Sequence, residues 1–221
     1  MFRPAMRSLL DTLDDVDRRD FVRRSTRRSF RAGDKVFWQD DPGDSVHLVA
    51  RGSFVASVAT PLNQTVVVSV FRRSDVFGEL AVIGAEPRRN ATVSALERSE
   101  TLSMDAEQFE EWRKRSPQID RALVRALALR LDEMTQQMLE ALYVPIDQRV
   151  VRRILALHEA IGPRATDDWL HIRQEEFAAY CGVTRATVNR VLRKLSEVGL
   201  VELGRGRLRV TDRVRLLEMV D

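Results

Sequence analysis

The chain has 221 residues, of which 44% are hydrophobic and 31% are charged, and its formal net charge is +3. It is long enough for two globular domains of ordinary size. No apolar run approaches the ~18 residues that a membrane span requires, and the N-terminus has no apolar signal region, so we expect a cytoplasmic protein with no membrane partner. The single cysteine, Cys181, excludes an intrachain disulfide and a site built from several thiolates.

The N-terminal stretch predicts short helices and a polar surface. Residues 5–24 place Leu9, Leu10, Leu13 and Val16 on one side, and we expect them to cap a domain. The basic run 18–31 is mixed with acidic residues, which is more typical of a solvated surface than of a nucleic-acid patch.

From residue 30 onward the chain predicts strands. Short β-branched runs are separated by turn signals rich in Gly, Pro, Asn and Asp. The predicted strands are 36–38, 46–49, 54–58, 66–71, 92–95 and 101–104. Many short strands at regular spacing indicate an antiparallel sandwich or barrel.

Residues 76–84 and 87–93 break this rhythm and suggest an anion site. Gly78 would let the backbone approach a ligand, and residues 79–83 would form one helical turn whose N–H groups face an anion. Arg89 would supply paired hydrogen bonds to phosphate, and Glu79 would accept one from a sugar hydroxyl. The alternative is that Gly78 makes a turn, Glu79 caps a helix and Arg89 is a surface residue.

Residues 116–144 predict one long amphipathic helix without internal Gly or Pro. Its apolar residues recur every three or four positions, as along a coiled-coil seam. They are Ile119, Leu123, Leu127, Leu131, Met134, Met138 and Leu142. The helix either pairs with a second copy of itself or packs within one domain.

The C-terminal part predicts helices around a helix-turn-helix. Pro145 marks a hinge, residues 146–161 form a helix that Gly162 and Pro163 end, and residues 169–172 form a short strand. Residues 174–195 then read as a helix, a Gly-containing turn and a second helix with Thr184 as its N-cap.

The second helix of this motif has an apolar face and a polar outer face suited to a major groove. The residues that face outward are Arg185, Ala186, Thr187, Asn189, Arg190 and Arg193. Residues 200–210 read as a two-stranded wing whose turn presents Arg205 and Arg207 to phosphates. This arrangement predicts binding to double-stranded DNA.

Taken together, these motifs resemble the CRP/FNR family of bacterial transcription regulators over nearly the whole chain. The resemblance lies in the runs 33–37, 41–44, 51–53, 77–81 and 89–93, in the long helix and in the helix-turn-helix. It implies an α+β fold with three parts: an N-terminal cyclic-nucleotide-binding β-roll (jelly roll) at 1–115, a dimerisation helix at 116–144 and a winged helix-turn-helix at 145–221.

The resemblance also implies roles for individual residues. Glu79 would hold the ribose hydroxyl, and Arg89, Asn90 and the backbone amides of Gly78, Glu79, Leu80 and Ala81 would hold the cyclic phosphate. The partners implied are a palindromic operator, a second copy of the chain, RNA polymerase and a cyclic nucleotide, with cyclic AMP as the expected effector and no prosthetic group.

Two positions depart from the family pattern. Where cyclic-AMP receptors place Thr and Ser against adenine, this chain has Met134 and Thr135. Either packing holds the base, or the ligand is not cyclic AMP, or the cassette persists only as structure. Where many members have Glu on the reading helix, this chain has Ala186, so we expect an altered operator base pair.

The sequence therefore predicts a homodimeric, ligand-controlled transcription regulator whose seam includes Leu123, Leu127, Leu131 and Met138. The rival interpretations are a ligand-independent regulator with a vestigial cassette and a nucleotide-sensing subunit that acts through protein contacts. No nucleophile–base pairing or metal-ligand spacing suggests an enzyme. Cys181 and the three scattered histidines are interpreted as structural.

Overall fold

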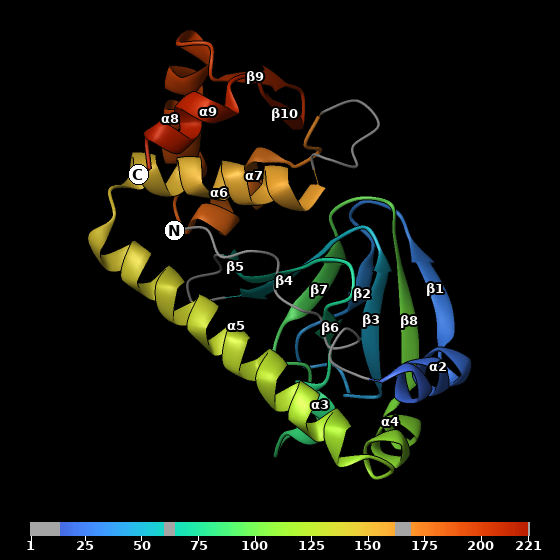
Figure 1. Ribbon diagram of the computed structural model, residues 1–221. Coiled ribbons are helices and arrows are strands. Elements are labelled where there is room, and N and C mark those ends of the chain that lie inside the picture. The colour runs from blue at the N-terminus through green and yellow to red at the C-terminus, as the bar shows by residue number, and fades with distance from the viewer. Residues whose placement is uncertain (1–13, 60–64, 162–168, 221) are drawn as a thin grey trace. The chain divides into compact units, whose positions relative to one another are not determined.

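The structure is a computed structural model that describes residues 14–59, 65–161 and 169–220 (Figure 1). The chain divides into two compact units. The N-terminal unit comprises residues 1–58 and 69–134, and the C-terminal unit comprises 59–68 and 135–221. The division falls inside the long helix, so each unit is described by itself.

Two four-stranded sheets form the β-roll, with the strand orders β1-β8-β3-β6 and β2-β7-β4-β5. The first sheet contains β1 (Thr26–Phe30), β8 (Ser99–Asp105), β3 (Ser45–Arg51) and β6 (Val76–Phe77). The second contains β2 (Lys35–Phe37), β7 (Thr92–Ala95), β4 (Phe54–Ala59) and β5 (Thr65–Phe71). The pairs β1–β8, β3–β8 and β4–β7 are antiparallel, which confirms the predicted architecture.

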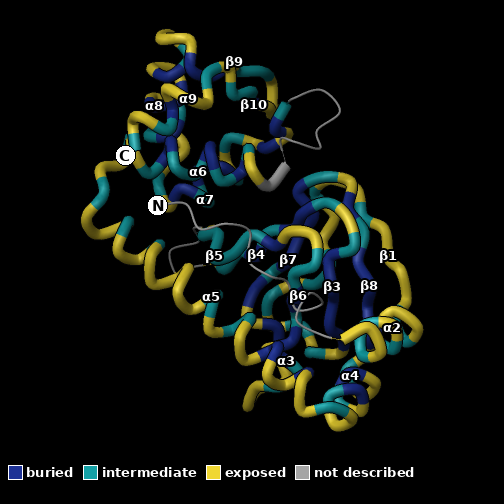
Figure 2. The backbone as a smooth tube through the Cα atoms, in the orientation of Figure 1, coloured by how far each residue is buried: buried dark blue, intermediate teal, exposed yellow. Residues whose placement is uncertain are grey.

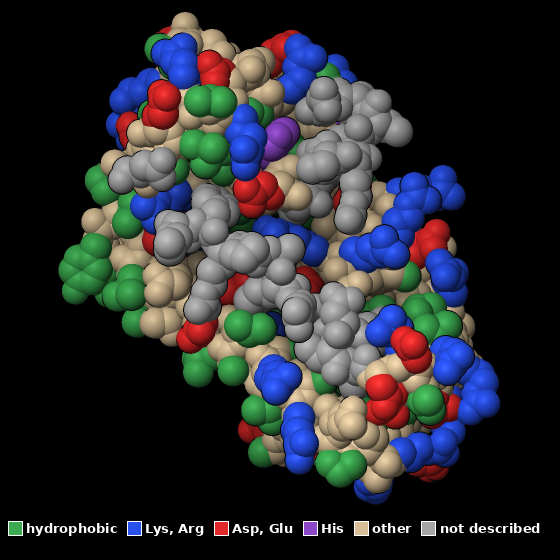
Figure 3. Space-filling model, viewed as in Figure 1, with side chains coloured by type: hydrophobic (Ala, Val, Ile, Leu, Met, Phe, Trp, Pro, Cys, Tyr) green, Lys and Arg blue, Asp and Glu red, His purple; other side chains and the backbone are tan. Residues whose placement is uncertain are grey.

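Strand β1 was not predicted because its sequence is almost entirely polar. Four of its five residues are exposed, and its register aligns Arg28 with Thr101 at the edge of the sheet. Figure 3 shows Lys and Arg side chains gathered over β1 and α2 (Asp15–Arg24), intermixed with acidic ones. Arg27 pairs with Glu100 and Arg23 with Asp20, as expected for a solvated surface.

Helices α2 and α4 (Ala106–Arg113) enclose the apolar core on one face of the first sheet. Phe21 of α2 meets Trp112 of α4 edge to face, with ring centroids 5.1 Å apart, and both side chains are fully buried. Val16, predicted to lie on the apolar side, is instead 67% exposed because Phe21 anchors the helix. Leu9, Leu10 and Leu13 lie outside the described residues.

The long helix is α5 (Pro117–Tyr143), close to its predicted bounds. Its first turns are buried in the core of the N-terminal unit, whereas most of its remaining length is exposed (Figure 2). Leu123 is only 4% exposed, so its assignment to an intersubunit seam is wrong: it packs with Ile119 against the core. Val124, at 64% exposure, faces outward beside it.

After the end of α5, the described residues of the C-terminal unit form four helices and the wing. They are α6 (Ile146–Ile161), α7 (Gln174–Cys181), α8 (Arg185–Glu197), β9 (Val201–Gly204), β10 (Arg207–Val210) and α9 (Arg213–Glu218). Gly182 turns the chain between α7 and α8 in the left-handed region, at φ 64°. The predicted strand at 169–172 is a single bridge in which Leu170 pairs with Leu208.

The junction of α7 and α8 is apolar, as predicted. Phe177, Cys181, Val188, Leu192 and Leu195 are all buried there. Burial of these side chains fixes the outer face of α8 and exposes its polar residues. Among the described helices, none combines the length and apolar character that crossing a bilayer requires.

Candidate ligand cassette and nucleic-acid interface

Gly78 follows β6 and occupies the left-handed region at φ 85°. A Cβ atom at this position would lie 2.7 Å from Nη1 of Arg89 and 3.0 Å from the carbonyl oxygen of Ser45. The glycine is therefore needed both for its backbone angle and for the close approach of Arg89. Glu79 follows as the N-cap of the short helix α3 (Leu80–Ile83), which confirms the predicted helical turn.

Arg89 is buried, with only 2% of its surface exposed. Its Nη1 donates to the carbonyl oxygens of Ser45 at 2.8 Å and Gly78 at 3.0 Å. Its Nη2 donates to Oδ1 of Asp44 at 2.8 Å and Oγ of Ser45 at 3.1 Å. The guanidinium also lies 4.1 Å from the ring centroid of Phe37. The alternative interpretation of Arg89 as a surface residue is therefore wrong.

The environment of this guanidinium changes two pKa values. Burial lowers the pKa of Arg89 from its ordinary value, against the opposing effect of Asp44. Burial alone would raise the pKa of Asp44, but hydrogen bonds from Ser45 and Arg89 bring it below its ordinary value. Both groups are charged at neutral pH, so the cassette contains a fixed ion pair at the position where the sequence predicts an anion.

Glu79 lies beside this pair and is 2% exposed. Its Oε1 accepts a hydrogen bond from Nη1 of Arg130 at 2.6 Å, and Nη2 of Arg130 donates to the carbonyl oxygen of Val76 at 2.8 Å. Its Oε2 is buried and has no hydrogen-bond partner among the described residues. A buried acceptor without a partner is costly, so Oε2 is available to a hydroxyl donor.

Arg130 was missed by the sequence analysis, although it lies on the predicted helix. No motif signal sets it apart from the other charged residues of α5. Its guanidinium also lies 4.9 Å from the ring centroid of Phe71. The fold brings it to Glu79 from 51 residues away in the sequence.

Most of the remaining predicted ligand residues are more exposed than Glu79 and Arg89. Ala81 is 4% exposed and Leu80 is 37% exposed, both on α3. The Asn90 side chain is exposed, and no described hydrogen bond joins it to the cassette. Met134, at 49% exposure, and Thr135 follow each other on α5 as exposed residues. The structure thus brings together Gly78, Glu79 and Arg89.

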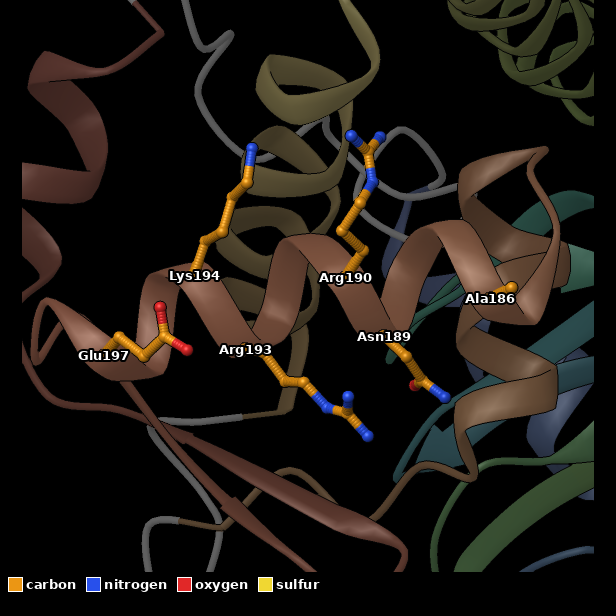
Figure 4. Close-up of a pocket in the computed structure, with 6 residues that line it drawn as sticks. All are labelled: Ala186, Asn189, Arg190, Arg193, Lys194 and Glu197. Atoms are coloured by element: carbon orange, nitrogen blue, oxygen red, sulfur yellow. The ribbon is translucent and has the colours of Figure 1, made fainter.

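The reading helix α8 begins as predicted at the N-cap Thr184, whose Oγ1 accepts a hydrogen bond from the backbone N–H of Thr187 at 3.3 Å. A shallow groove runs along its outer face (Figure 4). The groove is lined by Ala186, Asn189, Arg190, Arg193, Lys194 and Glu197. Arg185 is likewise exposed at the first position of the helix.

The cationic side chains of this groove project from two sides of α8. In Figure 4, Arg190 and Lys194 project from one side of α8, and Asn189 and Arg193 project from the other. Arg190 lies 4.0 Å and Lys194 3.6 Å from the carboxylate of Asp147, on the first turn of α6. Both pairs are at least 45% exposed on each side and therefore weak. Lys194 and Asp147 were not among the predicted site residues.

The wing places Arg205 and Arg207 at the surface, where both side chains are exposed. Gly206 between them adopts φ 68°, which makes the tight turn of the hairpin. Arg209 is paired with Glu202 across the two strands. The wing and α8 therefore present two separate groups of cations, as an interface for nucleic acid requires.

Cys181 and His47 are structural, as predicted. Burial raises the pKa of the Cys181 thiol to about 12, so it is not a reactive thiolate at neutral pH. Burial, with the nearby Arg89, lowers the pKa of His47 to about 3, and its ring nitrogens contact Ser45 and Thr101. Within the described part of the chain, no three potential metal-ligating side chains converge.

Two domain families match the chain. Residues 27–116 match the cyclic nucleotide-binding domain, and residues 148–219 match the Crp-like helix-turn-helix domain. The chain is 32% identical to the cyclic AMP receptor protein of Thermus thermophilus over 195 residues, which cover 87% of each chain. It belongs to the CRP family of transcription regulators.

Other CRP-family relatives support the same assignment. The CRP-like cAMP-activated global transcriptional regulator of Mycobacterium tuberculosis is 28% identical over 85% of this chain and 84% of its own length. Among solved structures, the catabolite activator protein of Thermus thermophilus has a TM-score of 0.54 at 29% identity, covering 96% of this chain and 97% of its own.

The c-di-GMP responsive regulator CLP of Xanthomonas campestris shares the fold, with a TM-score of 0.77 at 21% identity over 90% of this chain and 100% of its own. The domains and relatives of this CRP-family chain are those of DNA-binding regulators and not of enzymes.

Proposed function

We propose that this CRP-family regulator acts as a homodimer whose affinity for a palindromic operator is controlled by a cyclic nucleotide, with cyclic AMP as the expected effector. The observation that carries the proposal is the paired arrangement of Arg89 and Glu79. Arg89 supplies a buried cation held in place by its partners. Glu79 has a buried oxygen, Oε2, without a hydrogen-bond partner in the described part of the chain. A cyclic phosphate could accept from the buried Nε of Arg89, which has no partner among the described residues, and compete with Asp44 for Nη2, while a ribose hydroxyl could donate to Oε2 of Glu79.

Relatives support cyclic AMP as the effector, since those from Thermus thermophilus and Mycobacterium tuberculosis are described as a cyclic AMP receptor and as cAMP-activated. Calorimetry with cyclic AMP, cyclic GMP and cyclic di-GMP tests the ligand directly. We expect cyclic AMP to bind and Glu79→Gln to weaken that binding. Glu86→Gln, an exposed carboxylate of the same unit, is the matched control and leaves binding unchanged.

Control of DNA binding is a separate step with its own test. A mobility-shift titration with a selected operator compares the free protein with the protein at saturating cyclic AMP. We expect tighter binding with ligand, since coupling of about 1–3 kcal/mol between the two sites is typical of allosteric proteins. An unchanged operator affinity would refute ligand control and leave the DNA-binding function intact.

The homodimer is supported by the exposed apolar side chains of α5. Val124, Leu131 and Met138 are 58–66% exposed and recur every seven residues, the repeat of a coiled-coil seam. Two reading helices related by a two-fold axis would enter successive major grooves about 34 Å apart. Sedimentation should give a dimer, and Leu131→Asp should dissociate it, whereas Gln136→Asp, off the stripe, should not.

A second candidate function is ligand-independent DNA binding with a vestigial cassette. It is favoured by the hydrogen bond from Arg130 to Glu79, which already occupies Oε1, and by Met134, whose side chain is a poor partner for a base edge. No heat of binding with any of the three nucleotides, together with normal operator binding, would establish this function instead.

A further inference from the structure

Trp169 lies directly before the bridge in which Leu170 pairs with Leu208 of the wing. The backbone N–H of Leu170 donates to the carbonyl oxygen of Leu208 at 2.7 Å, and the reverse bond measures 3.0 Å. This pairing holds the indole beside β10. The guanidinium carbon of Arg207 is 4.3 Å from the indole centroid, and that of Arg209 is 5.2 Å away. Both distances lie in the range of cation–π contacts.

Gly204 provides an independent observation at the same place. A Cβ atom there would lie 2.8 Å from Cγ and 2.9 Å from Nε of Arg207, and 3.2 Å from Cζ3 of Trp169. Gly204 is not among the glycines with positive φ, so its backbone angle does not demand glycine. The missing side chain instead leaves the space through which Arg207 reaches the indole.

The two arginines on the indole differ in charge compensation. Arg209 is paired with Glu202 across the hairpin. Arg207 is exposed, and among the described residues it has no ion-pair partner. An arginine side chain in water samples many rotamers, and ordering it on binding costs conformational entropy. The indole removes part of that cost without neutralising the charge, since the ring face carries no net charge.

We propose that Trp169 is a positioning residue for DNA binding: its indole face holds the Arg207 guanidinium in the orientation in which it contacts a DNA phosphate. The inference rests on the proposed contact between the wing and DNA. It assigns different roles to the wing arginines, with Arg207 as a preorganised phosphate ligand and Arg209 as a hairpin ion pair.

The test is a double-mutant cycle with Trp169→Ala, Arg207→Ala and the double variant. The probe is a fluorescently labelled random-sequence duplex, because phosphate contacts do not depend on sequence. Anisotropy titrations over a range of salt concentrations give the affinity and its salt slope. We expect Trp169→Ala to weaken binding about two- to fivefold, and the double variant to bind no more weakly than Arg207→Ala alone.

Three further variants separate positioning from a structural role. Trp169→Phe keeps an aromatic face and should restore most of the affinity, whereas Gly204→Ala blocks the approach of Arg207 and should reproduce the loss. Trp38→Ala is the matched control, because Trp38 is 58% exposed beside Lys35 in the other unit. The affinity of the Trp38→Ala variant for the duplex should equal that of the unmodified protein.

Additive losses in the double variant, or wild-type affinity of Trp169→Ala, would overturn the inference while the wing contact stands. If Arg207→Ala itself leaves affinity and salt slope unchanged, the proposed wing contact fails, and the inference fails with it. The salt slope identifies the phosphate interaction, since removing one such interaction lowers the magnitude of the slope by about 0.9.

Discussion

Arg89 lies in the proposed ligand cassette and Arg190 on the exposed face of α8, and the environments of these two arginines are opposite. Arg89 is 2% exposed, and both terminal nitrogens donate to Asp44, Ser45 and Gly78. Arg190 is exposed and lies 4.0 Å from Asp147. A buried guanidinium must have partners before any ligand arrives, whereas an exposed one is satisfied by water.

This difference separates two ways of binding phosphate. The cassette around Arg89 is preorganised, so an anion that bound there would gain orientation and would also compete with the partners already in place. The cations of α8 bind by releasing counterions, and their contribution depends strongly on salt. Removing the buried guanidinium of Arg89 should therefore destabilise the fold, whereas removing an exposed cation of α8 should change the affinity for DNA alone.

The largest expected effect comes from Arg89→Ala. It leaves the buried carbonyl oxygen of Ser45 without this donor and empties the space beside Phe37, so we expect the N-terminal unit to lose about 3 kcal/mol of unfolding free energy. Thermal unfolding measures the loss, and Arg88→Ala, at an exposed neighbour, is the control. Equal stability of the two variants would contradict the preorganised cassette.

Arg190→Ala should behave in the opposite way. Its unfolding temperature should match that of the unmodified protein, while discrimination at one operator base pair falls by about 1–3 kcal/mol. Binding-site selection followed by competition titrations measures this change. Arg98→Ala, an exposed arginine of the N-terminal unit, is the control. A loss of stability in Arg190→Ala would show that the exposed face also supports the fold.

His47 lies near Arg89, and its pKa makes the stability of the N-terminal unit depend on pH. Its pKa is about 3 in the folded chain against 6.5 in the unfolded one. Below pH 6.5 the unfolded chain takes up a proton that the folded chain does not. Stability is therefore lost as the pH falls from 6.5 towards 3, by about 2 kcal/mol at pH 5.

The measurement is the unfolding temperature of the N-terminal unit as a function of pH. His47→Gln should remove most of the acid sensitivity between pH 6.5 and 5, and His171→Gln, at an exposed position, should leave it unchanged. An identical pH profile for His47→Gln would show that other groups cause the acid response.

The sequence predicted the parts of both sites that have a local signal. Gly78 and the helical turn after it were predicted from the glycine and from the break in the strand pattern, and α8 from its period and its N-cap Thr184. Arg130, Asp44 and Trp169 were not assigned to either site, because their partners are distant in sequence and no periodicity marks them. Strand β1 was missed because its polar residues lack the apolar alternation of a strand.

The difference between local signals and distant contacts also explains why the assignment of Leu123 to the dimer seam is wrong. The seven-residue repeat of α5 predicts one continuous stripe, yet the structure buries Leu123 in the core and leaves Val124 at the surface. A repeat states which residues share a helix face, but not which neighbour covers that face at each turn. Tertiary contacts of the N-terminal unit decide this for the first turns of the helix.

The smallest expected effect concerns Asp147, which faces Arg190 at 4.0 Å and Lys194 at 3.6 Å. DNA must draw these cations away from the carboxylate, so Asp147→Asn should tighten binding by less than about 1 kcal/mol, as expected for exposed ion pairs. The gain should be largest at low salt and disappear where the Debye length becomes short. Glu175→Gln, an exposed carboxylate on α7, provides the control in the same titrations. A gain that persists at high salt would mean that Asp147 restricts the geometry of α8 and does not merely compete for its charges.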